Sequence, residues 1–275
     1  MSDLNTSENH EGTAERKSRR QVMELRDVTI GHQPDVSLCL HNESMIIHRG
    51  DLVLVRTKES QSTRRFASML QGLVPPNTGS VLFNGRDWAT QHARTQFAMR
   101  RRIGRVFARQ GWIGNLNVRD NLLLAKQHFG ADLAAIEKEL VFWADWFQIG
   151  NISRMRPALV EASSLQVHQW IRAYLGKPAL LILERPMRSV SSKMFKVFLA
   201  SVRQMQQHGA AVIWIAGSTL GDDLDSVSPD AVLDMRRVTE EPPMTLPEGS
   251  VGESSIGEGG VGEDSVGDRD GGGKK

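Results

Sequence analysis

The chain has 275 residues, a formal net charge of +2 at pH 7 and a single cysteine, Cys39. This length allows one substantial domain or two small ones with a full hydrophobic core. The near-neutral charge gives no indication of nucleic-acid binding, the lone cysteine excludes an internal disulfide framework, and no apolar run reaches the roughly 18 residues of a membrane-spanning helix. We therefore expect a soluble protein of a reducing cytoplasm, which another subunit must hold at any membrane where it works.

The first 20 residues are polar and carry a basic cluster between Arg16 and Arg20. Contact with acidic lipid or nucleic acid is one interpretation of this cluster, and a solvated, disordered leader is the one we favour. Two early strands are predicted over residues 22–30 and 36–48, where apolar and polar residues alternate.

A strand, a polar loop and a helix are predicted next, in the arrangement of a phosphate-binding unit. Residues 52–55 form a continuous apolar run, which is typical of a buried parallel strand. The loop runs from Arg56 to Thr63, and the helix after it has apolar residues at spacings of three and four.

The loop lacks most of the chemistry of a working phosphate-binding loop, G-x-x-x-x-G-K-[ST]. There, glycines turn amide groups onto the phosphates and the lysine reaches the outer phosphates. Here Val55 and Ser60 stand at the two glycines, and Gln61 stands at the lysine. Only the hydroxyl pair, Ser62 and Thr63, is kept. Holding a non-glycine residue in a glycine-only conformation costs about 1–3 kcal/mol, so we expect no ordinary phosphate nest.

Strands and helices alternate through the rest of the chain. Apolar strands are predicted at residues 81–85, 103–107, 179–186 and 210–217, helical segments at 116–148, 164–176 and 193–207, and the ordered part is expected to close with residues 230–238. This alternation favours a mainly parallel sheet with helices on both faces, and the helical block between strands predicts an inserted subdomain over about residues 109–176.

The composition divides the chain into three predicted parts: a disordered leader (1–20), a folded domain (21–239) and a disordered tail (240–275). The tail is rich in Pro, Gly, Ser and Glu, with four imperfect five-residue units over residues 250–269. It has too few large apolar groups to build a core. Its acidic residues could suggest calcium, but the repeat lacks the spacing of known calcium loops.

The order of these elements resembles the nucleotide-binding subunit of ATP-binding cassette (ABC) transporters. The resemblance covers roughly residues 21–240 and is carried by GDLVLV…ST…LQGLVPPNTGSVLFNG, RRIGRVF…GNLNVRDNLLLA and WIRAYLGKPALLILERP. It implies an α/β fold of the P-loop NTPase type, with a mainly parallel sheet, an antiparallel β part and an inserted helical subdomain. The RDN phrase and the overall length look most like the ATPase subunits of MCE-type lipid transporters of the Gram-negative envelope.

The resemblance assigns chemical roles to positions whose residues do not suit them. Ala108 stands where the family has a glutamine beside Mg²⁺, and Gly217 stands where the family has its switch histidine. In the family, a signature motif caps the partner's γ-phosphate with a helix N-terminus. It falls here on Glu161, Ala162, Ser163 and Ser164. Glu161 places an anion where a phosphate would have to sit.

Two further positions concern the metal and the catalytic base. Glu184 stands at the metal-binding aspartate, and Arg185 stands at the catalytic glutamate. Losing a positioned general base costs about 10² to 10⁴ in rate, so we expect no hydrolysis. With the lysine and metal gone, Glu184 is expected to be partly buried beside no cation. Arg185 is then expected to pair with Glu59 or Glu161, and a solvated Arg185 at a strand end is the alternative.

Residual nucleotide binding is a second interpretation. Lys58, Arg64 and Arg65 could act as point charges on phosphate, and Ser62 and Thr63 could meet Mg²⁺. Ser62 is also typical of a helix N-cap, which needs no ligand. We expect no cofactor, with ATP and Mg²⁺ only if nucleotide binding remains.

In the family, each ATP lies between the P-loop of one subunit and the signature of the other. Because both halves are lost here, the resemblance favours a non-catalytic subunit with a docking surface in the helical block, about residues 109–148. Its expected partners are an integral membrane permease and a second ABC subunit or a second copy, at the cytoplasmic face of the inner membrane and without nucleic acid. Two alternatives stay open: a divergent but active ATP-binding subunit, and a soluble scaffold or regulator unrelated to transport.

Overall fold

The computed structural model describes most of the predicted folded domain. The described residues are 19–30, 40–58, 63–109, 111–217 and 226–235. All of them belong to one compact unit of the chain, which spans residues 1–239. The expected leader and tail fall almost entirely outside the described residues and stay predictions.

The described residues form strands and helices that alternate along the chain. The strands are β1 (Gln21–Ile30), β2 (Leu40–His48), β3 (Leu52–Arg56), β4 (Thr78–Phe83), β5 (Arg86–Asp87), β6 (Ile103–Val106), β7 (Leu180–Glu184), β8 (Ala211–Ala216) and β9 (Ala231–Asp234). The helices are α2 (Arg64–Leu70), α3 (Ala93–Arg100), α4 (Val118–His128), α5 (Leu133–Trp146), α6 (Ala162–Tyr174) and α7 (Phe195–Gln207), with 3₁₀ turns η1 (Trp88–Thr90), η2 (Pro157–Leu159) and η3 (Ser192–Met194).

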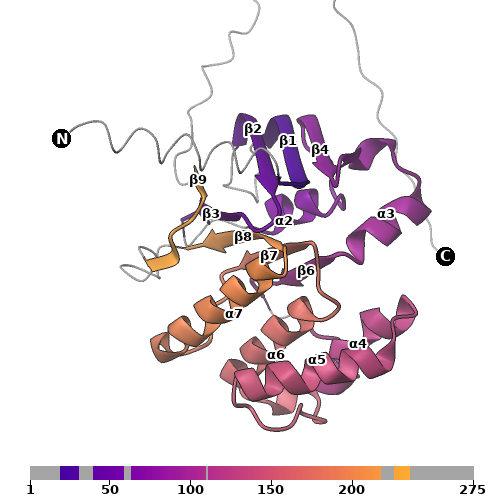
Figure 1. Ribbon diagram of the computed structural model, residues 1–275, viewed down its shortest axis with the longest axis vertical. Helices are drawn as coiled ribbons and strands as arrows, with labels where there is room; N and C mark the ends of the chain where they lie inside the picture. Colours follow the sequence, from indigo (N-terminus) through magenta and orange to yellow (C-terminus); the bar gives the residue numbers. More distant parts are fainter. Residues whose placement is uncertain (1–18, 31–39, 59–62, 110, 218–225, 236–275) are drawn as a thin grey trace, which may run out of the picture. The chain divides into compact units, whose positions relative to one another are not determined.

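The strands form two sheets (Figure 1). One has the order β2-β1-β4-β5 and is antiparallel. The other has the order β6-β7-β8-β3-β9, and its strand pairs are parallel. The predicted fold class, a mainly parallel α/β core with an antiparallel part, is confirmed.

The parallel sheet separates two hydrophobic clusters, because successive side chains of a strand point to opposite faces. Val53 and Val55 pack with α2 and the antiparallel sheet. Leu52 and Leu54 belong to the cluster that contains α6 and α7. Figure 1 shows α2 between the two sheets and the helices α4, α5 and α6 on the opposite side of the parallel sheet. Burial on both faces explains why these strands read as continuous apolar runs.

Strand β6 lies directly against helix α6. A Cβ atom placed on Gly104 of β6 would be 2.0 Å from the carbonyl oxygen of Ala173 in α6. No side chain fits at that distance, so glycine is required there for the backbone of the strand to approach the backbone of the helix.

The helical block predicted over residues 116–148 consists of α4 and α5, which form the inserted subdomain together with α6. None of the helices in the described ranges is both long and apolar enough to cross a lipid bilayer. Helix α3 was not predicted, because Met99 is its one buried residue and its sequence has little apolar periodicity. The helix predicted from residue 193 begins as η3 and becomes α-helical at Phe195.

Candidate functional site

The carboxyl ends of β3, β6 and β7 meet at one edge of the parallel sheet, where the family would hold its nucleotide. Glu184 ends β7 and is 1% exposed. Thr63, which precedes α2, and Arg105, in β6, are also buried. These three side chains come from segments far apart in the sequence, and the fold brings them into contact.

Glu184 has a protein donor on each carboxylate oxygen. The Nε of Arg105 donates to Oε1 at 2.7 Å, and the Oγ1 hydroxyl of Thr63 donates to Oε2 at 2.6 Å. Arg105 also donates from Nη1 to Oε1 of Gln71 at 2.7 Å, and its guanidinium lies 4.7 Å from the ring centroid of Phe107. A buried arginine with two acceptors and an aromatic face is well satisfied. We call Thr63, Gln71, Arg105 and Glu184 the interior cluster.

The expectation that Glu184 lies beside no cation is wrong. Arg105 supplies the cation from the neighbouring strand, since Arg105 and Ile182 are register partners in the β6–β7 pair. The sequence did contain a signal, an arginine inside the apolar strand IGRVF. A charged residue in the middle of a buried strand is almost never left without a partner.

The loop residues Glu59, Ser60, Gln61 and Ser62 lie outside the described residues, so their predicted roles are not tested. Lys58 is exposed, and its carbonyl oxygen accepts a bond from Nη2 of Arg185 at 2.9 Å. Thr63 is the N-cap residue of α2, but its hydroxyl bonds to Glu184 and caps no amide. The Thr63 hydroxyl therefore donates its hydrogen bond to the Glu184 carboxylate and does not cap the first turn of α2.

Arg185 leaves the strand in an unusual backbone conformation. Its φ is 45°, in the left-handed region, and its amide donates to the carbonyl oxygen of Ile215 at 2.8 Å. This conformation costs about 1–2 kcal/mol for a residue with a side chain. It takes the chain out of the extended course of β7, and the Arg185 side chain reaches the backbone of Lys58 across the sheet edge. The pair predicted with Glu59 falls on a residue outside the described ranges.

The two other positions with assigned roles offer no suitable side chain. Ala108 has only a methyl group there, and its carbonyl oxygen lies 3.4 Å from Nη1 of Arg188. Gly217 directly follows β8 and is buried. Neither residue carries a side-chain donor or acceptor, so neither can orient water or a metal ligand as glutamine or histidine would.

Residues 161–164, to which the resemblance assigns the signature motif, lie at the start of α6, which begins two residues before the predicted residue 164. Glu161 is the exposed N-cap residue and its side chain accepts no bond from the helix amides, while Ala162, Ser163 and Ser164 form the first turn. One turn later, Nδ1 of His168 lies 2.7 Å from the carbonyl oxygen of Ser164, and its Nε2 accepts from the amide of Ser153 at 3.4 Å. These two bonds require a neutral ring, and burial lowers the pKa of His168.

The described residues do not fit Mg²⁺ and a triphosphate. Both oxygens of Glu184 already have donors, and a cation already lies beside it. The described part of the chain contains no group of three or more His, Cys, Asp or Glu residues placed to hold a metal. The interior cluster is a self-contained polar unit.

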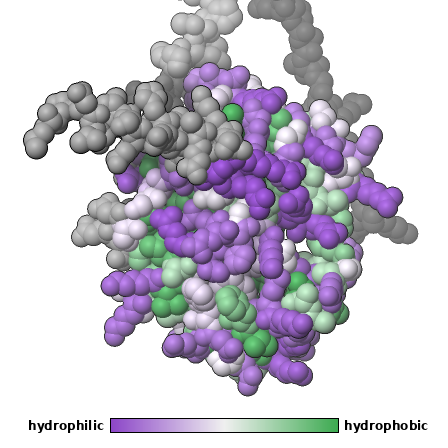
Figure 2. All heavy atoms as spheres, viewed as in Figure 1, coloured by the Kyte–Doolittle hydropathy of each residue, from purple (hydrophilic) through white to green (hydrophobic). Residues whose placement is uncertain are grey.

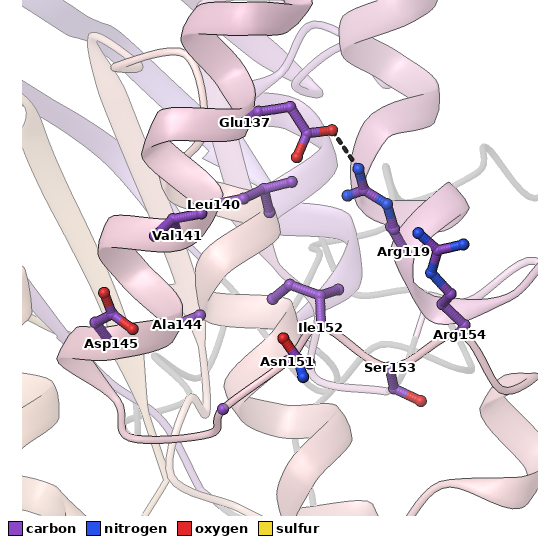
Figure 3. Close-up of a pocket in the computed structure, with 11 residues that line it drawn as sticks. Arg119, Glu137, Leu140, Val141, Ala144, Asp145, Asn151, Ile152, Ser153 and Arg154 are labelled. Carbon is purple, nitrogen blue, oxygen red and sulfur yellow. Dashed lines mark hydrogen bonds and ion pairs between the residues drawn. The ribbon is translucent and has the colours of Figure 1, made fainter.

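A second candidate site is an open groove of about 580 Å³ in the helical subdomain (Figure 3). Leu140 and Val141 of α5 and Ile152 of the following loop supply its apolar lining, while Arg119 of α4 and Glu137 of α5 form an ion pair at its rim. The helices of this groove lie in the predicted docking block. The loop that forms one wall of the groove, residues 150–154, lies outside that block. The sequence did not predict its role, because an irregular loop has no apolar periodicity.

Sequence comparison places these features in a wider context. No protein-family model matches the chain. The chain is 22% identical over 192 residues to the cell division ATP-binding protein FtsE of Bacillus subtilis (strain 168), which covers 70% of this chain and 84% of FtsE. It is 24% identical over 168 residues to the methionine import ATP-binding protein MetN 2 of Paraburkholderia xenovorans (strain LB400), which covers 61% of this chain and 44% of MetN 2.

Solved structures agree on the fold. The dimeric structure of MJ0796, a bacterial ABC transporter cassette, aligns with a TM-score of 0.66 over 78% of this chain and 94% of that one, at 16% identity. The chain therefore has the ATP-binding cassette fold and is similar in sequence to ATP-binding subunits of ABC transporters.

Proposed function

We propose that this chain is a non-hydrolysing, pseudo-ATPase subunit of a membrane transport complex. The observation that carries the proposal is the interior cluster, in which Arg105 and Thr63 donate to both oxygens of Glu184, the carboxylate at the position of the family's metal-binding aspartate. The proposed subunit keeps the cassette fold for its surfaces and needs no nucleotide to complete its interior.

The energy of the buried pair supports this proposal. To admit Mg²⁺ beside Glu184, the chain would have to move the Arg105 guanidinium out of a site where it is nearly inaccessible to solvent. Breaking a buried ion pair costs about 3–5 kcal/mol, because the remaining charge is left uncompensated. A metal would have to overcome this penalty before it gained anything from binding.

The residues around the cluster argue in the same direction. Arg185 brings a positive charge to the position of a catalytic base, and Gly217 removes the side chain that would assist it. An absent general base alone costs about 10² to 10⁴ in rate. The two changes act at the ends of different strands, so one local rearrangement cannot compensate for both.

The groove of the helical subdomain supports a partner role. It is open, and its lining mixes apolar side chains with polar and charged ones, which is a composition that suits contact with another protein. MetN 2 is by its name an import protein, and on this basis we assign the chain an integral membrane permease as partner, at the cytoplasmic face of the membrane. The MCE-type lipid transporters stay the predicted context within the family.

A thermal melt with nucleotide tests the proposal. A ligand that binds only the folded state adds RT ln(1 + [L]/Kd) to the free energy of unfolding, about 2.7 kcal/mol at a hundredfold excess over Kd. We expect millimolar ATP with Mg²⁺ to leave the melting temperature unchanged. A clear rise that is removed by Lys58→Ala would overturn the proposal, and a rise that Lys58→Ala leaves intact would point to binding elsewhere on the chain.

A divergent, active ATP-binding subunit is the second candidate, and one observation favours it. A hydroxyl and a carboxylate, those of Thr63 and Glu184, stand within 2.6 Å of each other where the family holds its metal. Steady-state turnover of ATP by the purified chain decides between the two. Mg²⁺-dependent phosphate release that is lost in Glu184→Gln but kept in Glu137→Gln would establish the active subunit.

A further inference from the structure

A second groove, of about 300 Å³, lies between α5, the end of α6 and the end of α7. Its apolar walls are the side chains of Phe142 and Trp143 of α5, Tyr174 of α6 and Met205 of α7. Three of these are buried, while Phe142 is 47% exposed at the edge of the groove. The groove shares no lining residue with the one drawn in Figure 3. We call it the aromatic groove.

Several polar atoms of the lining residues already have partners inside the chain. The Tyr174 hydroxyl lies 3.0 Å from Oγ of Ser201, and Oε2 of Glu139 accepts a backbone amide hydrogen at 2.6 Å. Nδ1 of His208 lies 2.7 Å from a backbone carbonyl oxygen of α7. The walls therefore offer few hydrogen bonds to a polar ligand.

Two ammonium groups at the aromatic groove have no counterion among the described residues. Lys138 of α5 and Lys177, which follows α6, line the groove and are exposed. Neither belongs to the ion pairs found within the described ranges. Glu139, the one carboxylate among the lining residues, bonds to the amide of Gly176 and interacts with the half-buried Lys126. The groove thus combines an apolar interior with a positive rim.

We propose that the aromatic groove binds a medium-chain fatty acid, with its apolar chain against the aromatic walls and its carboxylate at Lys138 and Lys177. A methylene group is about as large as a water molecule, roughly 30 Å³, so the groove takes a chain of about ten carbons. Lysine ammonium groups are point charges on flexible stems, so they can reach one carboxylate without a fixed geometry.

An alkyl chain suits the aromatic groove better than a segment of protein. A peptide carries an N–H and a C=O at almost every residue, and burying these groups without partners is costly. Gln204 has the one side-chain amide among the lining residues, so the groove cannot satisfy a peptide backbone. An alkyl chain has no polar group to satisfy, and each methylene removed from water favours binding. The carboxylate at its end matches the positive rim.

The aromatic groove lies at the opposite edge of the parallel sheet from the interior cluster. Lys177 shortly precedes β7 and His208 shortly precedes β8, whereas Glu184 ends β7. The amino ends of parallel strands meet at one edge of a sheet and the carboxyl ends at the other. Binding at the aromatic groove leaves the interior cluster untouched, so it goes beyond the proposed function and does not rest on it.

Isothermal titration calorimetry of the full chain with decanoate, below the concentration at which decanoate forms micelles, tests the proposal. We expect one saturable site. Hexanoate should bind at least tenfold more weakly, because four methylenes are missing. Decyltrimethylammonium has a chain of the same length and the opposite charge, and it should show no saturable binding.

Substitutions locate the site. Lys177→Glu and Phe142→Asp should each raise the dissociation constant for decanoate at least tenfold. Lys196→Glu changes an exposed lysine of α7 outside the groove, and Phe97→Asp changes a phenylalanine of α3 that is 45% exposed. These two matched controls should bind decanoate like the wild type, and circular dichroism confirms that every variant folds.

Four results would overturn the inference. Decanoate that shows no saturable binding removes the site, and binding that Lys177→Glu and Phe142→Asp leave unchanged places the ligand elsewhere. Equal binding of decyltrimethylammonium would leave the lysines without a role. Vesicles of acidic phospholipid that bind the chain when decanoate does not would assign the lysines to a membrane surface. None of these results bears on the thermal melt with ATP, which tests the proposed function separately.

Discussion

Two of the arginine–glutamate pairs among the described residues differ in burial. In the interior cluster, the side chains of Arg105 and Glu184 are 6% and 2% exposed. At the rim of the groove, those of Arg119 and Glu137 are 25% and 42% exposed. The same chemical pair thus stands in one place where water is excluded and in another where water reaches both partners.

The comparison separates a charge on which the stability of the fold depends from a charge that is available for contacts with other molecules. A buried charge that loses its partner cannot be compensated by water, so it destabilises the fold. An exposed pair contributes about 0–1 kcal/mol, because solvation replaces most of the interaction. Figure 2 shows hydrophilic side chains over much of the face in view, with hydrophobic ones interspersed. We therefore expect the first pair to control stability and the second to control recognition.

Arg105→Leu should have the largest effect. It leaves the Glu184 carboxylate buried beside no cation, and we expect the free energy of unfolding to fall by about 3–5 kcal/mol in urea denaturation. The double variant Arg105→Leu, Glu184→Leu removes both charges and should recover at least half of this loss. A double variant as unstable as the single one would show that Arg105 acts through packing and not through its charge.

Thr63→Val should have the next largest effect. Valine keeps the shape of threonine but removes the hydroxyl that donates to Glu184 at 2.6 Å. A hydrogen bond to a charged group contributes about 1.5–3 kcal/mol, so the free energy of unfolding should fall by that amount. Thr57→Val, which removes a bond between neutral groups, is the matched comparison and should cost less. An equal loss in the two variants would contradict the special role of the carboxylate.

His168 should make stability depend on pH, with a smaller effect than either change in the interior cluster. Burial lowers its pKa in the folded chain below the ordinary value of 6.5. The unfolded chain therefore binds the proton more readily, and the free energy of unfolding should fall as the pH drops below about 6.5. Urea denaturation between pH 5 and pH 8 measures this slope. His168→Gln should flatten it, and an unchanged slope would assign the dependence to other groups.

Arg119→Leu should have the smallest effect on stability, below about 1 kcal/mol, because its pair is exposed. By the proposed function it should instead lower the amount of chain recovered with the membrane fraction of cells that contain the permease partner. Arg86→Leu, an exposed arginine outside the groove, is the matched control and should be recovered like the wild type. A loss of stability near that of Arg105→Leu would remove the contrast between the two pairs.

The sequence predicted the fold well because burial leaves a strong local signal. The strands of the parallel sheet are covered on both faces, so β7 and β8 read as apolar runs, and α5 and α7 show clear periodicity. Helix α3 has no such pattern and was missed. The interior cluster could be predicted only in part: the resemblance identified Thr63 and Glu184, but no local pattern tells that Arg105, 79 positions before Glu184, reaches its carboxylate. Such a contact depends on which strands become neighbours in the sheet.

The close approach at Gly104 determines how the helical subdomain can move. With the backbones of β6 and α6 in contact there, the helix cannot slide along the sheet or roll on it without separating the two main chains. Rotation of α4 and α5 must therefore bend the chain at its two connections, between Val106 and Val118 and between Trp146 and Ala162, while α6 stays in place against β6. Movements of the groove would then reach the sheet through torsion at these connections and not through translation of α6.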